Sequence, residues 1–368
     1  MKKNGRVTNF CNAWFGKALL IIILAGFTWA CQKDAPADDP KTTALKKVVY
    51  VADEDDGTIT VINAESKAKI KIIDLSYNGE MYMPHNVQVA PNGKTVWVTC
   101  VPMQEGSDEF VAVIDAVQNT VIKHINVGKE QHIAHVVLDD ESKFAYVTGN
   151  ESNQVIKLDA DSLKEVRRFE IGDNHKPHGM RYYNHQLFIA NMDGKSMSIL
   201  DINTGQINEI QLGGVAVQTA ITPNGAYAFA SLYDTREVAV YNIQTQNLTK
   251  VKLPEGSQGP IQLYPTPDNK MVYVCDQGVL ENRSASNKVY VLDIEMGMID
   301  KTITVGNGAH GIVICNQGTQ AYVTNSKDNT ISIIDLQTNS VTQTLPVGKA
   351  PNGISFWFSS NGNIGGMK

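Results

Sequence analysis

The sequence is poor in the residues and motifs that mark most enzyme classes. Its 368 residues include only five cysteines and 7% aromatic residues. It has no CxxCH haem-attachment motif, no HExxH zinc motif, no glycine-rich phosphate loop after a strand and no GxSxG nucleophile motif. These absences argue against covalently bound haem, the common zinc proteases, P-loop chemistry and α/β-hydrolase catalysis. They favour a protein that is not an enzyme.

An excess of basic residues is also missing. The 32 Lys and Arg residues are outnumbered by 38 Asp and Glu residues, and no basic stripe is visible along the chain. Binding to a phosphate backbone needs clustered positive charge. Nucleic acid is therefore not an expected partner, and a monomeric protein that binds another protein or a small molecule is favoured.

The one long apolar run lies at the start of the chain. Residues 18–30 read ALLIIILAGFTWA and follow the basic residues Lys2, Lys3, Arg6 and Lys17. The run is short for a membrane span, and a basic head before an apolar stretch of this length is typical of a secretory signal. Residues 1–30 are therefore predicted to form a signal peptide.

The end of that run resembles a bacterial lipobox, because a small residue, Ala30, stands directly before Cys31. The resemblance implies cleavage before Cys31 and lipidation of its thiol, which would anchor the protein to a membrane. The polar residues 31–46 predict a flexible tether. The letters CQKDAPADD are similar to the export signal of Bacteroidota lipoproteins. The expected location is thus the outer membrane, facing the periplasm or the cell surface.

The rest of the chain is organised by a repeat of about 42 residues. Seven times an apolar stretch closes on Asp or Asn, in contexts such as AVIDAVQ and SIIDLQT, and a second strand soon follows. The closing residues are Asn63, Asp115, Asp159, Asp201, Asn242, Asp293 and Asp335. A period of this size made only of short strands and turns predicts a β-propeller. The closing residues themselves are predicted to form Asx turns with a structural role.

Each repeat is interpreted as four strands, a to d, counted outwards from the ring axis. Residues 48–75 supply strands b, c and d, whereas the residues around Asn352–Phe358 supply a strand a with nothing after it. The two ends should therefore share one blade, which is called velcro closure and leaves no open sheet edge. The prediction is an all-β, seven-bladed propeller over residues 47–360, with 361–368 as a short tail.

Three cysteines belong to the predicted propeller, namely Cys100, Cys275 and Cys315. They are odd in number, and Cys100 and Cys275 fall in blades 2 and 6, which are not neighbours in a ring of seven. The spacing therefore predicts no disulfide framework, and buried free thiols are expected.

The segment AYVTNSKDNTISIIDLQTNSVTQTLPVGKAPNGI resembles the YVTN family of β-propeller repeats. FAYVTGNESNQVIKLDADS and VVYVADEDDGTITVINAES are weaker copies of the same unit, and together the copies cover nearly all of the mature chain. The resemblance implies the propeller fold. It implies little about function, because the family includes surface proteins, binding modules and relatives that look like enzymes.

Histidines gather where the repeats enter strand a, on the face that also carries the d–a and b–c loops. The residues aligned at this entry are His85, Ala134, His178, Val217, Ile261, His310 and Asn352. His135 stands one place beyond Ala134. We call His85, His135, His178 and His310 the histidine rim. Imidazole suits copper, zinc, iron and nickel, so His85, His178 and His310 are candidate metal ligands. The alternative is a structural turn in which each ring bonds to a neighbouring loop.

The b–c loops add polar groups to the same face. Strand b ends on Asp53, Asn191, Asp276 and Asn325 in four blades, and these side chains either bind a ligand or satisfy loop backbone. Methionines also map to these loops. Methionine with histidine suggests a copper site, and a haem-like group is the other candidate cofactor.

Three functions therefore stand at this point. The first is a lipid-anchored binding or scaffold module that acts through its loop-rich face, where long loops on a rigid scaffold usually bind partners. The second is a metal- or haem-binding protein for redox chemistry or cofactor handling at the histidine rim. The third is a hydrolase or lactonase, which would need a central cation held by carboxylates.

The lipoprotein prediction is tested by replacing the cysteine. Because lipid is expected on the Cys31 thiol alone, Cys31→Ser should release the protein from the membrane fraction and abolish metabolic labelling with palmitate. Labelling of the Ser variant at the level of the parent protein would rule out Cys31 as the anchor.

Overall fold

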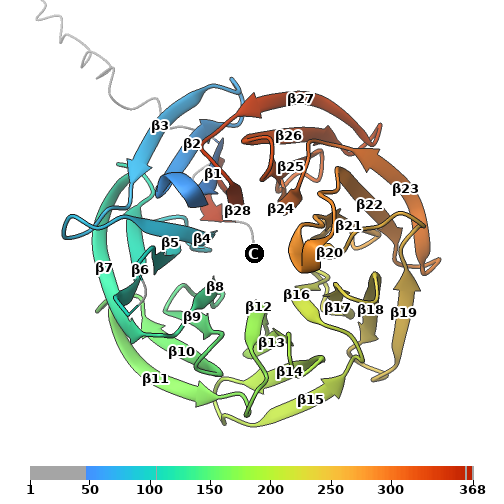
Figure 1. The fold of residues 1–368 in the computed structure, drawn as a ribbon, viewed down its shortest axis with the longest axis horizontal. Helices are drawn as coiled ribbons and strands as arrows, with labels where there is room; N and C mark the ends of the chain where they lie inside the picture. The colour runs from blue at the N-terminus through green and yellow to red at the C-terminus, as the bar shows by residue number, and fades with distance from the viewer. Residues whose placement is uncertain (1–46, 105, 361–362, 367–368) are drawn as a thin grey trace, which may run out of the picture. The chain divides into compact units, whose positions relative to one another are not determined.

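The computed structural model describes residues 47–104, 106–360 and 363–366 as seven antiparallel sheets arranged around one axis (Figure 1). This ring confirms the predicted seven-bladed propeller. The predicted signal peptide and the whole predicted tether, including Cys31, lie outside the described residues. Among the residues described, no helix is long and apolar enough to cross a membrane.

Each blade consists of consecutive strands whose order runs outwards from the axis. Blade 1 combines β28 (Pro351–Ser360) with β1 (Lys47–Asp53), β2 (Thr58–Asn63) and β3 (Lys69–Asp74). Blade 2 contains β4 (Tyr82–Val89), β5 (Thr95–Pro102), β6 (Asp108–Asp115) and β7 (Thr120–Lys129). Blade 3 contains β8 (Ile133–Leu138), β9 (Phe144–Gly149), β10 (Gln154–Asp159) and β11 (Lys164–Glu170). Blade 4 contains β12 (Pro177–Tyr183), β13 (Gln186–Asn191), β14 (Ser196–Asp201) and β15 (Ile207–Gln211).

The remaining blades follow the same order. Blade 5 contains β16 (Ala216–Ile221), β17 (Tyr227–Leu232), β18 (Glu237–Asn242) and β19 (Leu248–Lys252). Blade 6 contains β20 (Pro260–Pro265), β21 (Met271–Asp276), β22 (Lys288–Asp293) and β23 (Met298–Thr304). Blade 7 contains β24 (Ala309–Ile314), β25 (Gln320–Asn325), β26 (Thr330–Asp335) and β27 (Ser340–Pro346). Two short 3-10 helices, η1 (Glu54–Asp56) and η2 (Leu280–Asn282), lie in b–c loops.

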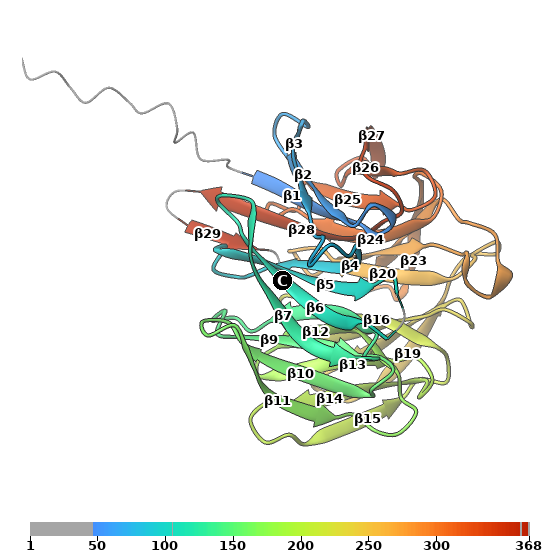
Figure 2. The ribbon, with the colours of Figure 1, turned by 60° about the vertical axis from the view of Figure 1, so that its left-hand side comes forward.

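The ring closes through the pairing of the two ends of the described chain. β28 runs antiparallel to β1, with Lys47 opposite Phe358 and Val51 opposite Ile354. This register confirms the velcro closure. A further strand, β29 (Asn363–Gly366), pairs with the end of β28 (Figure 2), and the repeat pattern had given no sign of it.

The Asx turns are present in all seven blades. The side-chain oxygen of each strand-c closing residue accepts backbone N–H bonds from the residues two or three places later, as Asn63 does from Glu65 and Ser66 at 2.9 Å. The equivalent bonds are made by Asp115, Asp159, Asp201, Asn242, Asp293 and Asp335. Their structural role is thereby confirmed.

The hydrophobic core lies between neighbouring blades, where strands a, b and c bury both faces. Strand b of blade 1, for example, has the burial sequence of a fully enclosed strand from Val48 to Asp53. The outermost strands are mostly exposed, and they carry apolar side chains such as Ile72 and Ile122 on the surface. Cys100, Cys275 and Cys315 are buried free thiols, as predicted.

Every innermost strand carries a β-bulge at the same place. In β4 the pairing register with strand b shifts between Pro84, one residue before His85, and Val87. The same shift occurs in β8, β12, β16, β20, β24 and β28. All four rim histidines lie inside these shifts. Each shift encloses two residues, such as His85 and Asn86 in β4, which we call the first and second bulge positions. A bulge re-aims side chains, so it determines the direction in which each of these two side chains points.

A hydroxyl on strand b holds the bulge to the next blade. The Thr148 Oγ1 accepts the N–H of His135 in its own blade and donates to the carbonyl of His178 in blade 4, at 3.0 and 2.7 Å. Thr324 does the same between Gly311 and the Asn352 carbonyl. Thr99 and Ser231 repeat the arrangement in blades 2 and 5. We call these four side chains the hydroxyl clamps.

Ring closure can be tested by shortening the chain. Ending it at Ala350 removes β28, whose residues Pro351–Trp357 are all buried. Losing that apolar burial costs several kcal/mol, a large part of the stability of a typical domain. The shortened protein should therefore lose cooperative thermal unfolding, as measured by calorimetry.

Two substitutions in the full-length chain test how much burial in β28 contributes to stability. Phe356 is fully buried in β28, so Phe356→Ala should lower the free energy of unfolding by about 3–5 kcal/mol. Val117 is 72% exposed in a turn, so Val117→Ala should change it by less than about 0.5 kcal/mol. Unchanged melting of the shortened protein would contradict the closure.

Candidate metal centre

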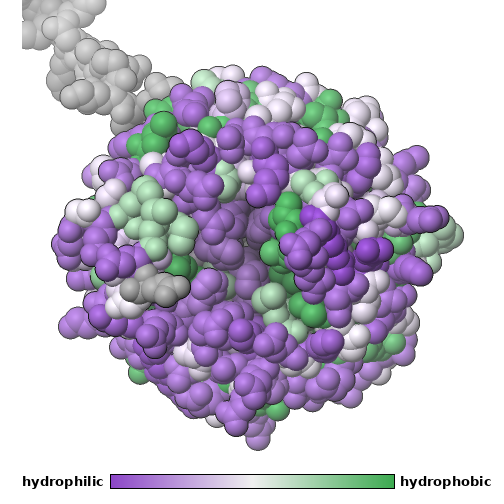
Figure 3. All heavy atoms as spheres, in the orientation of Figure 1, coloured by the Kyte–Doolittle hydropathy of each residue, from purple (hydrophilic) through white to green (hydrophobic). Residues whose placement is uncertain are grey.

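Three rim histidines from neighbouring blades meet at one mouth of the ring. His85 comes from β4, His135 from β8 and His178 from β12, and one ring nitrogen from each lies within 4.8 Å of the others. The ring centroids are 5.2–6.0 Å apart. We call these residues the His trio. Seen down the axis, the centre of the ring is hollowed and its wall is mainly hydrophilic (Figure 3).

His85 has one nitrogen held by a carboxylate and the other left without a partner. Its Nδ1 lies 3.3 Å from Oε1 of Glu54, in η1, and 3.1 Å from Nδ2 of Asn352. Asn352 also donates to the second oxygen of Glu54 at 2.8 Å. In the tautomer whose Nδ1 donates to the carboxylate, Nε2 carries the lone pair. The Nε2 atom is buried with no hydrogen-bond partner. A carboxylate behind an imidazole is the usual outer-shell support of a metal-bound histidine.

The charge on Glu54 follows from this arrangement. Burial raises the pKa of Glu54, but the hydrogen bond from His85, the charge of His85 and the hydrogen bond from Asn352 together lower it to about 2. Glu54 is therefore ionised at neutral pH. Its negative charge is available to stabilise a cation bound by His85.

His178 is fixed by a backbone carbonyl. Its Nδ1 donates to the carbonyl oxygen of Val217 at 2.9 Å, because a carbonyl can only accept. The neutral ring must then carry its lone pair on Nε2. A ring held in this way is oriented and has its tautomer set for metal binding through Nε2. The neighbouring hydroxyl clamp at Thr148 holds the backbone of the same residue.

His135 contacts Gln218 across an intervening blade. Its Nδ1 lies 3.3 Å from Nε2 of Gln218, which belongs to the second bulge position of blade 5. The equivalent position in blade 4 is Gly179, where an added Cβ would lie 2.2 Å from Oε1 of Gln218. The glycine after His178 in the motif KPHGM is thus needed so that Gln218 can reach His135.

The buried rings are held in the uncharged form. Burial lowers the pKa of His178 to about 3, and the charge of His85 adds to the effect. Burial, then the charges of His178 and His85, holds the pKa of His135 well below its usual range. Neutral imidazole is the form that binds metals, so neither ring is lost to protonation just below neutral pH.

His310 is the rim histidine that the structure leaves outside the His trio. It lies in β24, its Nδ1 is buried without a partner, and burial followed by the charge of His85 lowers its pKa to about 4. His135 joins His85 and His178 instead. In blade 3 the histidine stands at the second bulge position, whereas His85 and His178 stand at the first. His132 and His175, also in d–a loops, are not part of the trio; His175 bonds to Glu209 at 2.9 Å.

The four polar residues that end strand b are occupied within the fold. Asp53 accepts bonds from Thr58 and Thr60, five and seven residues later, and from the N–H of Gly348. Asn191 and Asn325 bond to hydroxyls at the same spacing.

Asp276 binds a loop instead, accepting from the Ser257 hydroxyl and from two backbone N–H groups. All four side chains are 0% exposed. Asp53, Asp276 and Asn325 accept backbone N–H bonds, as the backbone-satisfying alternative expects. Asn191 bonds only to side-chain hydroxyls, and its Oδ1 is buried without a partner. None of the four belongs to the His trio.

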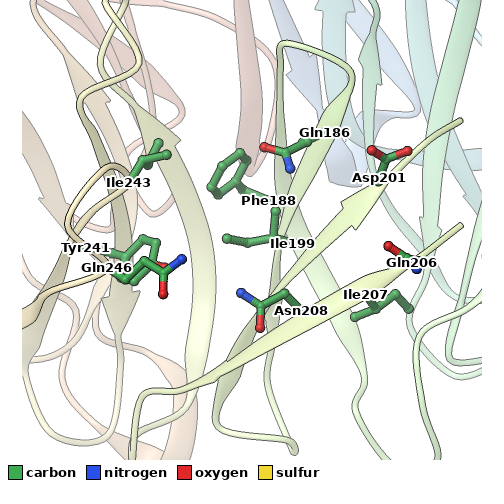
Figure 4. Close-up of a pocket in the computed structure, with 10 residues that line it drawn as sticks. All are labelled: Gln186, Phe188, Ile199, Asp201, Gln206, Ile207, Asn208, Tyr241, Ile243 and Gln246. Atoms are coloured by element: carbon green, nitrogen blue, oxygen red, sulfur yellow. The ribbon is translucent and has the colours of Figure 1, made fainter. Parts of the chain in front are cut away.

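The other candidate sites lie apart from the histidines. Figure 4 shows a cavity of about 490 Å³ between blades 4 and 5, lined by residues that include Phe188, Asn208 and Tyr241 and by no rim histidine. Among the described residues, the His trio is the one group of three or more His, Cys, Asp or Glu with ligand atoms close enough to share an ion. A cluster of three or more carboxylates that could hold the central cation needed by a lactonase is not found among them.

Comparisons with known proteins support the fold. No family model matches the chain, and no curated protein matches it. A functionally unknown protein from Desulfotomaculum acetoxidans is similar with a TM-score of 0.67 at 15% identity, covering 84% of this chain and 98% of that one. Virginiamycin B lyase from Staphylococcus aureus gives 0.62 at 14% identity, with coverage of 77% and 94%.

A haem-related protein is also among the similar structures. The dihydro-haem d1 dehydrogenase NirN, in complex with DHE, gives a TM-score of 0.59 at 15% identity, covering 81% of this chain and 63% of that chain. At these identities the likeness shows the propeller fold alone. The neighbours thus include a haem-related protein, a lyase and a protein of unknown function, which agrees with a scaffold that hosts many chemistries.

The lowered pKa of His310 predicts how stability depends on pH. An unfolded histidine takes up a proton as pH falls through about 6.5, whereas folded His310 resists protonation until about pH 4. The unfolded state therefore binds more protons in this window, so the free energy of unfolding falls as pH falls. Each such histidine contributes up to about 1.4 kcal/mol per pH unit.

Replacing His310 with Gln should flatten the decline between pH 6.5 and 4, measured by urea unfolding at several pH values. Phe356→Ala serves as the control, because it removes packing and no titrating group and should give a curve parallel to that of the parent protein. A His310→Gln curve that is also parallel would contradict the buried, uncharged state of His310.

Proposed function

We propose that this protein is an extracytoplasmic, lipid-anchored propeller of the YVTN type that binds a divalent transition-metal ion through the His trio. The observation that carries the proposal is the buried, unpartnered Nε2 of His85, whose Nδ1 faces the carboxylate of Glu54 beside two further imidazoles. A buried ring nitrogen without a hydrogen-bond partner costs free energy unless a ligand satisfies it. A metal ion is the ligand that three converging imidazoles fit.

Zinc and copper are the ions favoured by an all-imidazole donor set. A tetrahedral zinc with Zn–N bonds of about 2.0–2.1 Å would need ring nitrogens about 3.3 Å apart. The trio nitrogens lie within 4.8 Å, so small ring rotations suffice. Three protein ligands leave a fourth coordination position open, which would suit the handover or presentation of an ion.

A haem-like group is less well supported than an ion. Ring centroids only 5.2–6.0 Å apart leave no space between the rings for a flat macrocycle. Haem could then use only one rim histidine as an axial ligand. The anchor at Cys31 and the location in the outer membrane remain part of the proposal and rest on the leader sequence.

Metal binding is tested by calorimetry on the untagged mature protein with ZnCl₂ and CuCl₂. One ion should bind per chain, and His85→Ala, His135→Ala and His178→Ala should each weaken binding at least about tenfold, which is about 1.4 kcal/mol. Glu54→Gln should weaken binding less than loss of a ligand does, within the range of about 10–100-fold seen for outer-shell partners.

His175→Ala is the matched control, because His175 lies on the same face but bonds to Glu209 and is outside the trio. It should leave the affinity unchanged. Absence of zinc and copper binding, or equal loss in His175→Ala, would overturn the proposal. A stoichiometric Soret shift with haemin that disappears only in one His variant would favour the haem alternative instead.

A further inference from the structure

The opposite mouth of the ring carries a cavity with a very different lining. The innermost strands start at the mouth that holds the His trio and end at the other face. Residues three to four places after the aligned entry residues, such as Arg181 after His178, therefore lie near the second mouth. There, a cavity of about 390 Å³ is bounded by the ends of β12, β16 and β20, by the a–b turns and by β28. We call it the Arg pocket after Arg181.

Arg181 brings a positive charge that the described protein does not neutralise. Its Nη1 donates to the Met180 carbonyl at 2.9 Å, and no carboxylate of the described residues forms an ion pair with it. Burial lowers the pKa of Arg181, which reflects the cost of holding the charge there. A largely buried guanidinium without an anion is a ready binding site for one.

The walls around Arg181 are mostly apolar. Tyr182, Ile221, Pro265 and Phe358 are among the lining residues and supply aromatic and aliphatic surface. Cavities of a few hundred Å³ with apolar walls and few polar groups are typical of sites for small molecules. The walls therefore fit the apolar body of a ligand, while the guanidinium fits its charged end.

The donor set also selects the kind of anion. One guanidinium provides a two-pronged contact that matches a carboxylate, whereas a phosphate dianion needs more positive charge. We propose that the Arg pocket binds a small monocarboxylate with an aromatic or aliphatic body, independently of the metal at the His trio.

The experiment uses phenylacetate, its neutral analogue phenylacetamide, and inorganic phosphate as probes, with binding to the full mature chain followed by calorimetry and saturation-transfer NMR. Phenylacetate should bind at least about tenfold tighter than either of the other probes. Arg181→Gln should remove this preference. Arg181→Lys keeps the positive charge but loses the two-pronged guanidinium contact, so the variant should prefer phenylacetate less strongly than the parent does.

Zinc titration of the same variants provides the fold control. Arg181→Gln should bind zinc like the parent, and His178→Ala should bind phenylacetate like the parent, so that failure of either site is distinguishable from failure of the other. Equal binding of the acid and its amide, unchanged binding in Arg181→Gln, or no saturable binding of phenylacetate would each overturn the proposal.

Discussion

The hydroxyl clamps are the interaction on which the centre of the ring depends. A strand-b hydroxyl accepts an N–H from the bulge of its own blade and donates to a carbonyl in the bulge of the next blade, as Thr148 does between His135 and His178. A β-bulge leaves backbone groups without ladder partners. If these buried groups were unsatisfied, each would cost about 1–3 kcal/mol. The clamps therefore allow an irregular backbone to persist at the most buried part of every blade that has one.

The chemistry of the molecule arises where neighbouring blades differ within this common frame. At the second bulge position, blade 3 has His135, blade 4 has Gly179 and blade 5 has Gln218, and the glycine leaves the space through which Gln218 reaches the histidine. Because backbone clamps hold both sides of this gap, the side chains can change without loss of the ring. The same frame supports an imidazole-lined mouth at one end and a guanidinium among apolar side chains at the other.

Much of the fold could be predicted from the local sequence pattern, because the same pattern of strands and turns occurs seven times. The Asx turns, the blade count and the pairing of β1 with β28 all follow from spacing and strand propensity, which are local properties. The convergence of His85, His135 and His178 could not be predicted in full, since it depends on how each bulge rotates two successive residues. Glu54 was missed for a related reason: nothing in EDDG indicates that η1 turns a carboxylate towards a histidine 31 residues later. One signal was available in the sequence, because the threonine of the YVTN motif, Thr324, is a hydroxyl-clamp residue that holds the bulge.

The closing strand also takes part in the metal centre, and this links assembly to function. Asn352, in β28, bonds to Glu54, 298 residues earlier in the sequence, and lies against the Nδ1 of His85. The outer support of the His trio thus spans the seam where the two ends of the ring meet. A ribosome must release nearly the whole chain before this support can form, so a partly synthesised or unclosed ring would present the three imidazoles without it. By mass action, an ion that prefers the supported site would in turn hold the seam shut.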